Sequence, residues 1–208
     1  RSVRSQRLHL AYSTAAALGE KLNRLTDLGT SLASRPRFCE MVSAGKWADA
    51  SEILRAVPRD FPWIDSYFLA DPKGNLMAGF PLAGEARARN LASRDWYQGG
   101  HENRQPYISD VYQSAAAQRR KVIAVVAPIK ADDGEPAGVL VLEVTLASLH
   151  AWIKDIDAGE QAAILVFDKK GKLAAHPTLD LQSAVHDLSA SAAVQKARAG
   201  SRGVENAA

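Results

Sequence analysis

The chain has 208 residues, a formal net charge of +3 and 47% apolar residues. That length supports one large or two small domains with a buried core, and the balance of apolar and charged residues is typical of a globular protein. The weak charge argues against a nucleic-acid partner. Cys39 is the only cysteine, which excludes a disulfide within the chain.

The sequence contains no apolar run of the ~18 residues that a membrane-spanning helix needs, and it contains no signal peptide. It begins at Arg1 instead of a methionine and stops abruptly soon after Val204. We therefore expect it to be a piece of a longer protein, so the lack of a membrane segment in this stretch says nothing about that protein.

The first segment, residues 1–34, predicts a long helix that ends before Pro36, because the residue before a proline avoids helical angles. Apolar and small side chains recur at spacings of three and four over nearly four heptads. They are Leu8, Ala11, Ala15, Leu18, Leu22, Leu25, Gly29 and Leu32. This face predicts either packing along the helix's own domain or a dimer seam, which the small residues would make weak. A second helix is expected over 46–57, ending at Pro58.

Residues 64–69 and 75–80 predict a β-hairpin, because the turn between them has proline at its second position and glycine at its fourth. The signature of this hairpin returns 97 residues later. Asp71, Lys73, Gly74, Leu76 and Ala78 match Asp168, Lys170, Gly171, Leu173 and Ala175. Since a whole domain fits in that interval, we predict a tandem duplication.

The remaining pattern predicts an α+β fold. In the first copy we expect a helical patch at 94–100, strands at 107–112, 121–130 and 138–144, and a connecting helix at 145–156. Short linkers imply antiparallel pairing, so the first copy makes a five-stranded antiparallel sheet with helices alongside. In the second copy we expect strands at 162–167 and 172–176 and a helix at 189–199. Its last three strands are missing, so the second lobe is incomplete.

We accordingly divide the chain into an N-terminal helical segment at 1–60, a ligand-binding lobe at 61–150, and a connecting helix with a partial second lobe at 151–208.

The string Arg94-Asp95-Trp96-Tyr97 is the most informative local motif. It lies in a polar stretch with Arg87, Arg89 and Arg104. A guanidinium is a planar fork that matches a carboxylate, and Trp and Tyr supply rigid walls with one polar group each. These residues favour a pocket for a small anionic molecule. The alternative is that the two aromatic side chains belong to the core and that Arg94 is a solvated neighbour.

The order of these motifs resembles that of the double Cache sensor domains, which are extracytoplasmic ligand-binding modules of bacterial chemoreceptors, histidine kinases and diguanylate cyclases. The resemblance covers the long helix, the D-x-x-G hairpin, the R-x-W-Y string, the apolar strand Gly138–Val144 and the smaller second copy. It implies two PAS-like lobes on one long helix. It also implies a small-molecule ligand in the membrane-distal lobe and a periplasmic location in an inner-membrane receptor.

In the amino-acid-binding members of that family, the arginine holds the ligand carboxylate and the tryptophan helps. The adjacent tyrosine, a later tyrosine and a late aspartate serve the ammonium. The resemblance therefore implies a site of Arg94, Trp96, Tyr97 and Tyr107. Two positions depart from the pattern, because Arg89 replaces a tyrosine and Glu143 replaces the aspartate. An amino acid and a plain carboxylate or dicarboxylate both remain as ligand classes.

Glu143 lies in a strongly apolar strand, at the same parity as Val139 and Val141. Burying an unpaired carboxylate costs several kcal/mol. The side chain should therefore lie at the surface, pair with an arginine or await a cation.

Two other functional classes compete with a sensor, an enzyme and a ligand-free module. The sequence offers little for an enzyme, because it has no G-x-S-x-G elbow, no Gly-rich phosphate loop and no metal-ligand spacing among its five histidines. We therefore expect no catalytic residue, metal or cofactor in this chain. The remaining alternative is a ligand-free interaction or dimerisation module of a membrane receptor, in which Arg94, Trp96 and Tyr97 are structural.

Overall fold

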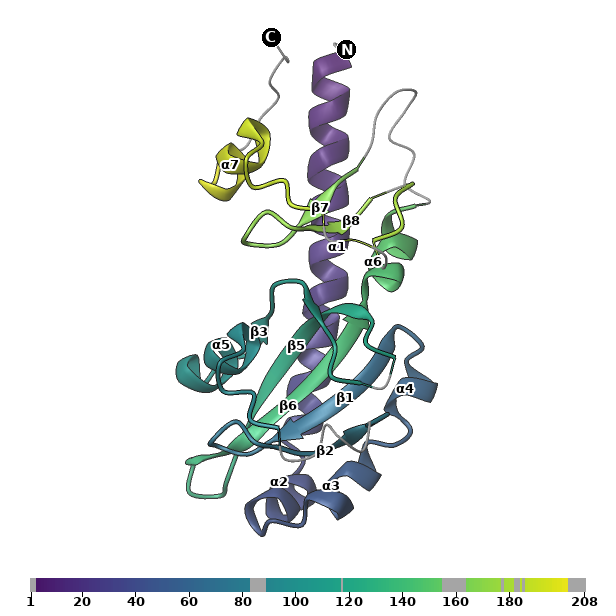
Figure 1. Cartoon of the computed structure of the whole chain (residues 1–208). Helices are drawn as coiled ribbons and strands as arrows, with labels where there is room; N and C mark the ends of the chain where they lie inside the picture. Colours follow the sequence, from purple (N-terminus) through teal and green to yellow (C-terminus); the bar gives the residue numbers. More distant parts are fainter. Residues whose placement is uncertain are drawn as a thin grey trace. The chain divides into compact units, whose positions relative to one another are not determined.

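The computed structural model describes residues 3–82, 89–116, 118–154, 164–176, 178–181, 184 and 186–201. The chain forms two compact units. The sheet unit comprises residues 24–145, and the terminal unit comprises residues 1–23 and 146–208 (Figure 1).

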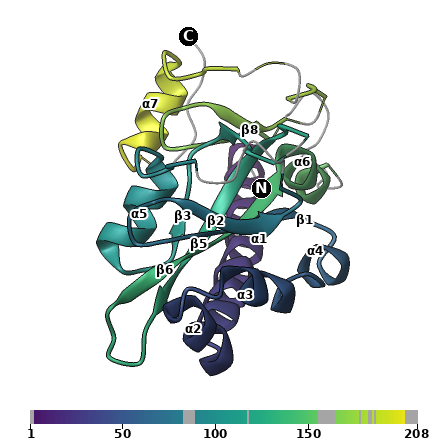
Figure 2. The same ribbon diagram turned by 60° about the horizontal axis from the view of Figure 1, so that its bottom comes forward.

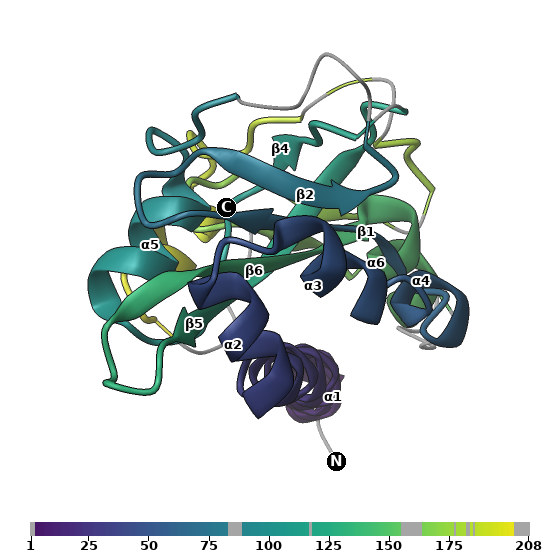
Figure 3. The ribbon, with the colours of Figure 1, turned by 90° about the horizontal axis from the view of Figure 1, so that it is seen from below.

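The predicted N-terminal helix is present as α1, Val3–Ala33. Its last turns belong to the sheet unit, where Leu25 and Leu32 are buried. A Cβ added to Gly29 would lie 3.5 Å from the side chains of Ala127 and Leu142, so this part of the helix packs closely on the sheet. Figure 3 shows α1 end-on, on one side of the sheet. The packing interpretation therefore holds for residues 25–32, and the dimer seam stays a prediction for the turns before them.

Three short helices follow: α2 is Pro36–Ser43, α3 is Trp47–Ile53 and α4 is Val57–Asp60. The predicted single helix over 46–57 is wrong, because the chain leaves the helix after Ile53 and Pro58 lies in the first turn of α4. A proline is tolerated there, since the N–H groups of a first turn have no partner inside the helix.

The sheet unit contains one antiparallel sheet with the strand order β2-β1-β6-β5-β3, and β4 also pairs with β5. Its strands are β1 Ile64–Ala70, β2 Leu76–Phe80, β3 Tyr107–Ile108, β4 Tyr112–Gln113, β5 Lys121–Lys130 and β6 Pro136–Thr145. The predicted hairpin and the two long strands are confirmed. The predicted strand at 107–112 is divided in two, because the Ser109 hydroxyl accepts the N–H of Ala124 at 2.8 Å and so replaces part of the ladder.

The register gives the sheet two distinct faces. Ser66 of β1 and Ala124 of β5 both pair with Glu143 of β6, so these three residues form a row across the sheet. Phe68 and Val141 form the next row on the same face. Helix α5, Asp95–Asn103, packs on this face against β3, β5 and β6 (Figure 2). We call this face, which α5 covers, the α5 face. The opposite face, with Val125, Ala127 and Leu142, packs against α1.

In the terminal unit the chain forms α6 Leu146–Ile153, β7 Val166–Phe167, β8 Leu173–Ala175 and α7 Ala192–Arg198. The expected helices and hairpin strands are present in shorter form, and residues 162–163 of the expected first strand lie outside the described residues. Among the described helices, none is both long enough and apolar enough to cross a membrane.

The internal repeat extends to the hydrogen bonds. Val166 and Phe167 pair with Ala175 and Leu173, and the residues 97 positions earlier pair in the same register with the same irregularity. Beyond the hairpin, Leu91 N–H donates to the Gly74 carbonyl and Leu188 N–H to that of Gly171. The tandem duplication is therefore confirmed through the start of α7.

Candidate functional site

Helix α5 begins directly after Arg94, whose extended backbone makes it the N-cap residue. The Arg94 carbonyl accepts the N–H groups of Tyr97 and Gln98, each at 3.1 Å. The Asp95 carboxylate accepts the N–H of Asp110 at 2.8 Å, which ties the start of α5 to the segment after β3. These bonds fix the first turn of α5, which holds the predicted binding string, over the sheet.

Trp96 and Tyr97 are buried, with exposed fractions of 2% and 5%. They belong to one apolar cluster with Phe68, Val126 and Val141, and Tyr107 and Tyr112 pack against it. Their rings meet edge to face with centroids 6.2 Å apart. Tyr97 also stacks on His101 at 5.1 Å, and its hydroxyl donates to the Asp71 carbonyl at 3.4 Å. The aromatic residues of the string are therefore part of the core of the α5 face.

Trp96 also carries a feature that packing does not explain. Its indole Nε1 is buried and finds no hydrogen-bond acceptor among the residues that the structure describes. An indole N–H can only donate, so it needs an acceptor. Leaving such a group buried without a partner costs about 1–3 kcal/mol. The first turn of α5 thus presents an unused donor.

Arg94 is half-buried, and its guanidinium carbon lies 5.7 Å from the centre of the Tyr112 ring. This distance is within the range of cation–π attraction. Tyr112 belongs to β4, which pairs with β5. The arginine of α5 is therefore supported by an aromatic side chain from the sheet edge.

Glu143 is fully buried on the α5 face. Three hydroxyl groups donate to its carboxylate: Ser66 and Ser114 to Oε2, and Tyr112 to Oε1 at 2.6 Å. A surface position, one of the three alternatives for this side chain, is therefore excluded. The prediction considered only surface exposure or a cationic partner, whereas neutral hydroxyl donors satisfy this carboxylate.

Burial raises the pKa of Glu143, and the hydrogen bonds from Ser114, Ser66 and Tyr112 oppose that rise. The pKa of Tyr112 is raised well above its ordinary value, by burial first and then by the neighbouring Glu143 carboxylate. Tyr112 therefore stays protonated, and its hydroxyl stays a donor to Glu143.

The structure places the other predicted site residues less centrally. Tyr107 of β3 pairs with Val126 of β5. Its ring lies directly under Gly99 of α5, where an added Cβ would approach the ring to 2.5 Å. The Arg89 side chain is exposed, while its carbonyl accepts the Leu76 N–H at 2.8 Å. A guanidinium nitrogen of Arg104 lies 3.9 Å from a carboxylate oxygen of Glu135. Arg87 lies outside the described residues. The structure thus gathers Trp96, Tyr97 and Tyr107, and links Arg94 to Glu143 through Tyr112.

Three members of this arrangement were missed in the sequence. Ser66 and Ser114 are separated from Glu143 by 77 and 29 residues, so only the strand register and the path of the loop bring them together. Tyr112 was missed because residues 107 and 112 of one continuous strand would face opposite sides of the sheet. The interruption between β3 and β4 lets both tyrosines join the α5 face.

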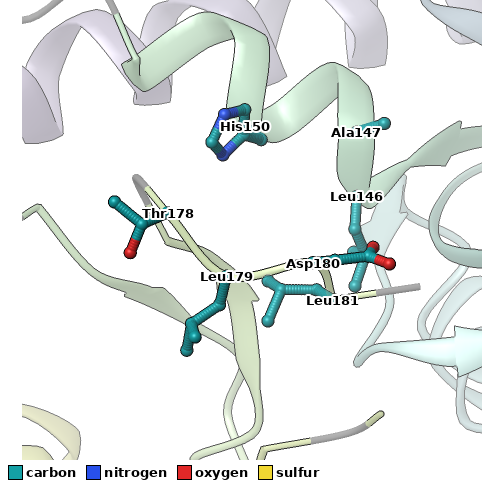
Figure 4. A pocket seen from close by; sticks show the side chains of 7 residues that line it. All are labelled: Leu146, Ala147, His150, Thr178, Leu179, Asp180 and Leu181. Carbon is teal, nitrogen blue, oxygen red and sulfur yellow. The ribbon is translucent and has the colours of Figure 1, made fainter. Parts of the chain in front are cut away.

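Two pockets are lined by other residues, one in each unit. In the terminal unit, a cavity of about 320 Å³ separates α6 from residues 178–181. Figure 4 shows His150 pointing from α6 toward that segment. Its Nδ1 lies 2.5 Å from the His176 carbonyl. In the sheet unit, a cavity of about 350 Å³ lies between α3 and β2 and is lined by Arg55 and Phe80. Among the described residues, no three His, Cys, Asp or Glu side chains are placed to hold a metal ion.

Comparison with known proteins identifies the fold. The model of the Cache domain family matches residues 2–206. The chain belongs to the Cache domain family. This membership agrees with the long helix, the antiparallel sheet and the second copy that the structure shows.

Two solved structures illustrate the similarity. One is the ligand-binding domain of the Campylobacter jejuni chemoreceptor Tlp3 in complex with 4-methylisoleucine, which is 17% identical with a TM-score of 0.66, over 85% of this chain and 73% of that chain. The other is the ligand-binding domain of the Pseudomonas fluorescens chemoreceptor CtaA in complex with L-alanine, which is 20% identical with a TM-score of 0.64, over 82% of this chain and 70% of that chain. At these identities the two structures show a shared fold.

A sequence relative is the methyl-accepting chemotaxis protein McpA of Bacillus subtilis (strain 168), which is 25% identical over 115 residues. The match covers 55% of this chain but only 16% of that protein, so this Cache domain corresponds to a small part of that relative.

Proposed function

We propose that this Cache domain is the ligand-binding sensor domain of a bacterial signal-transduction receptor, and that its α5 face binds a small carboxylate-bearing molecule. The buried indole N–H of Trp96, which has no acceptor among the residues that the structure describes, carries this proposal. A carboxylate supplies the acceptor that this donor lacks, and the Arg94 guanidinium two residues earlier supplies a matching positive fork. The amino-acid complexes of the Tlp3 and CtaA domains support the same ligand class.

In this proposal, Arg94 and Trp96 bind the carboxylate, and Tyr97 and Tyr107 form walls of the site. Arg89 is an exposed cation that attracts an anionic ligand from solution. Glu143 contributes through Tyr112, whose hydroxyl it accepts and whose ring lies beside Arg94. These are binding roles, and none of them requires the domain to be an enzyme.

Signalling requires a ligand that binds one of two conformations better than the other. A ligand bound to Arg94 pulls on a residue that rests on Tyr112, and Tyr112 is bonded to Glu143 of β6. Strand β6 continues directly into α6, so the chain itself offers a route out of the sheet unit. We further propose that the parent receptor is anchored in the inner membrane with this domain in the periplasm.

The test is a thermal-shift screen of the protein against amino acids, small mono- and dicarboxylates, amines and purines. A ligand at a hundred times its dissociation constant stabilises by about 2.7 kcal/mol, which raises the melting temperature by a few degrees. Arg94→Ala should abolish the shift. Arg59→Ala is the matched control, because that exposed arginine of the sheet unit forms an ion pair with its neighbour Asp60.

Two results would contradict the proposal. If no carboxylate stabilises a folded protein, the ligand-free interaction module becomes the better interpretation. If Arg94→Ala and Arg59→Ala leave a carboxylate shift equally intact, the ligand binds elsewhere, and the Trp96 indole is a structural donor only.

A further inference from the structure

The acceptor positions of Glu143 are largely in use. Its Oε2 accepts from the hydroxyls of Ser66 and Ser114, and its Oε1 accepts from Tyr112. An ionised carboxylate offers about four acceptor positions. Three of the four are therefore occupied by groups of the domain itself.

Two of these donors are committed by their surroundings. The Ser114 hydroxyl oxygen accepts the Ala116 N–H at 2.9 Å, so its own proton remains for Glu143. Ser66 faces Glu143 directly across the β1–β6 pair, and both residues are fully buried. Neither serine can turn toward another acceptor without leaving the carboxylate under-satisfied in the core.

The third donor, Tyr112, connects Glu143 to the ligand-binding end. The Tyr112 hydroxyl donates to Glu143 Oε1 at 2.6 Å. The centre of the Tyr112 ring lies 5.7 Å from the guanidinium carbon of Arg94. A tyrosine ring is rigid, so fixing its hydroxyl fixes the surface on which the arginine rests.

We propose that Glu143 is a positioning residue, which sets Arg94 through Tyr112, and that the ligands of this domain are small carboxylates whose α-amino group is dispensable. This inference rests on the proposed carboxylate site at Arg94 and Trp96. It differs from an amino-acid site in which the acidic residue of the last strand bonds the ligand ammonium directly.

An ammonium that bonded Glu143 would have to take the one remaining acceptor position or displace Tyr112 from Oε1. Displacing Tyr112 would remove a short hydrogen bond in the core and free the ring that supports Arg94, so an ammonium bound in that way would weaken the binding of the carboxylate.

The test compares matched ligands by isothermal titration calorimetry on the whole 208-residue protein. L-alanine is paired with propionate, and L-valine with 3-methylbutanoate. We expect the two members of a pair to differ by no more than about threefold in affinity, whereas a lost charged hydrogen bond corresponds to about tenfold or more.

Variants separate positioning from direct contact. Glu143→Gln and Tyr112→Phe should weaken both members of each pair by the same factor, because both act through Arg94. Tyr67→Phe is the matched control: it removes another buried hydroxyl, which donates to the Ser51 carbonyl at 2.7 Å, away from Arg94. It should leave all four affinities unchanged. If Glu143→Gln does not fold, Tyr112→Phe, which leaves the carboxylate in place, carries the comparison.

The outcomes distinguish the two proposals. If the amino acids bind and their amine-free partners do not, and Glu143→Gln weakens only the amino acids, Glu143 reads the ammonium and the positioning role is overturned while the carboxylate site stands. If none of the four ligands, nor any carboxylate of the thermal-shift panel, binds to the folded protein, the carboxylate site itself falls, and the positioning role falls with it.

Discussion

The two copies of the repeat share a scaffold and differ in chemistry. In both, an aspartate closes the turn: Asp71 accepts the N–H groups of Lys73 and Asn75, and Asp168 accepts those of Lys170 and Lys172. In both, a short helix begins after the same number of residues, α5 after Arg94 and α7 after Ser191.

The residues that the helices carry are different. Arg94, Trp96 and Tyr97 of the first copy correspond to Ser191, Ala193 and Val194 of the second. The second copy thus keeps the backbone hydrogen bonds without the guanidinium or the aromatic rings. The backbone pattern is therefore independent of these side chains, and the residues of the proposed carboxylate site occur in the first copy alone. A shared fold does not carry a shared site.

The largest expected difference between the copies concerns the first turn of the helix. Trp96→Ala removes a buried indole and should destabilise the sheet unit by about 3–5 kcal/mol. Ala193 is exposed, so Ala193→Gly should cost the terminal unit only about 1 kcal/mol, through helix propensity. Urea unfolding followed by circular dichroism measures both. Equal costs would show that Trp96 contributes little to the core.

The turn glycines should be equally sensitive in the two copies. Gly74 and Gly171 have φ angles of +81° and +87°, and an added Cβ would lie 2.8 Å or less from the backbone of Ala92 or Ser189. Each alanine substitution should therefore cost about 2 kcal/mol or more, from strain and from the displaced neighbour. Gly134 is the matched control, because its φ is +83° but nothing lies within 4 Å of the added Cβ.

Gly134→Ala should cost only the backbone strain, about 1 kcal/mol. Thermal unfolding of the three variants checks the order. If Gly171→Ala behaved like Gly134→Ala while Gly74→Ala did not, the second turn would be held less tightly than the first, and the equivalence of the copies would end at the hairpin.

The aspartates of the turns should differ slightly. Asp71→Ala and Asp168→Ala each remove two hydrogen bonds to backbone N–H groups, at a cost of about 1–2 kcal/mol. Asp71 also accepts the Asn75 side-chain N–H at 2.8 Å, a bond for which Lys172 has no counterpart amide. We therefore expect the loss to be greater in the first copy by a few tenths of a kcal/mol. Chemical denaturation of both variants measures it, and the reverse order would contradict the role of Asn75.

The repeat could be predicted from the sequence where it depends on the type of side chain. The match from Asp71 to Ala78 rests on residues that the turn itself requires, namely an acceptor at its start and a glycine at positive φ. The helix at 189–199 was expected in the second copy, but the hydrogen bonds that continue the match beyond the hairpin were not predicted, because backbone groups make them. Leu91 and Leu188 match in sequence. The residues on either side of them differ, because Asn90 corresponds to Asp187 and Ala92 to Ser189.

The candidate site shows the same limit in another form. The string from Arg94 to Tyr97 was recognisable because its residue types have distinctive chemistry. The hydroxyl groups around Glu143 were not, because serines are common residues, and only strand register places Ser66, and only the path of the loop places Ser114, beside this carboxylate. Short-range pattern predicts turns and strings, whereas the partners of a buried charge depend on which distant strands meet.

The smallest predicted difference between the copies is a pH dependence, at the position that is Asn90 in one and Asp187 in the other. Both side chains accept the N–H of the residue two positions on, at 3.0 Å in Ala92 and 2.8 Å in Ser189. Hydrogen bonds from the side chain and the backbone of Ser189 lower the pKa of Asp187 below its ordinary value of 3.8. A lowered pKa adds stability above pH 3.8, and that stability is lost as the pH falls through the folded-state pKa. Asn90 does not titrate.

The terminal unit should therefore lose a small contribution in acid that the equivalent turn of the sheet unit keeps. Asp187→Asn gives the second copy the residue of the first, and should flatten the pH dependence of terminal-unit unfolding between about pH 2 and 4 without changing that of the sheet unit. A carboxyl titration of Asp187 by NMR checks the direction of the shift directly. An unshifted or raised pKa would mean that the Ser189 contacts do not persist in solution, and the two turns would then share a backbone path without sharing the side-chain bond that closes it.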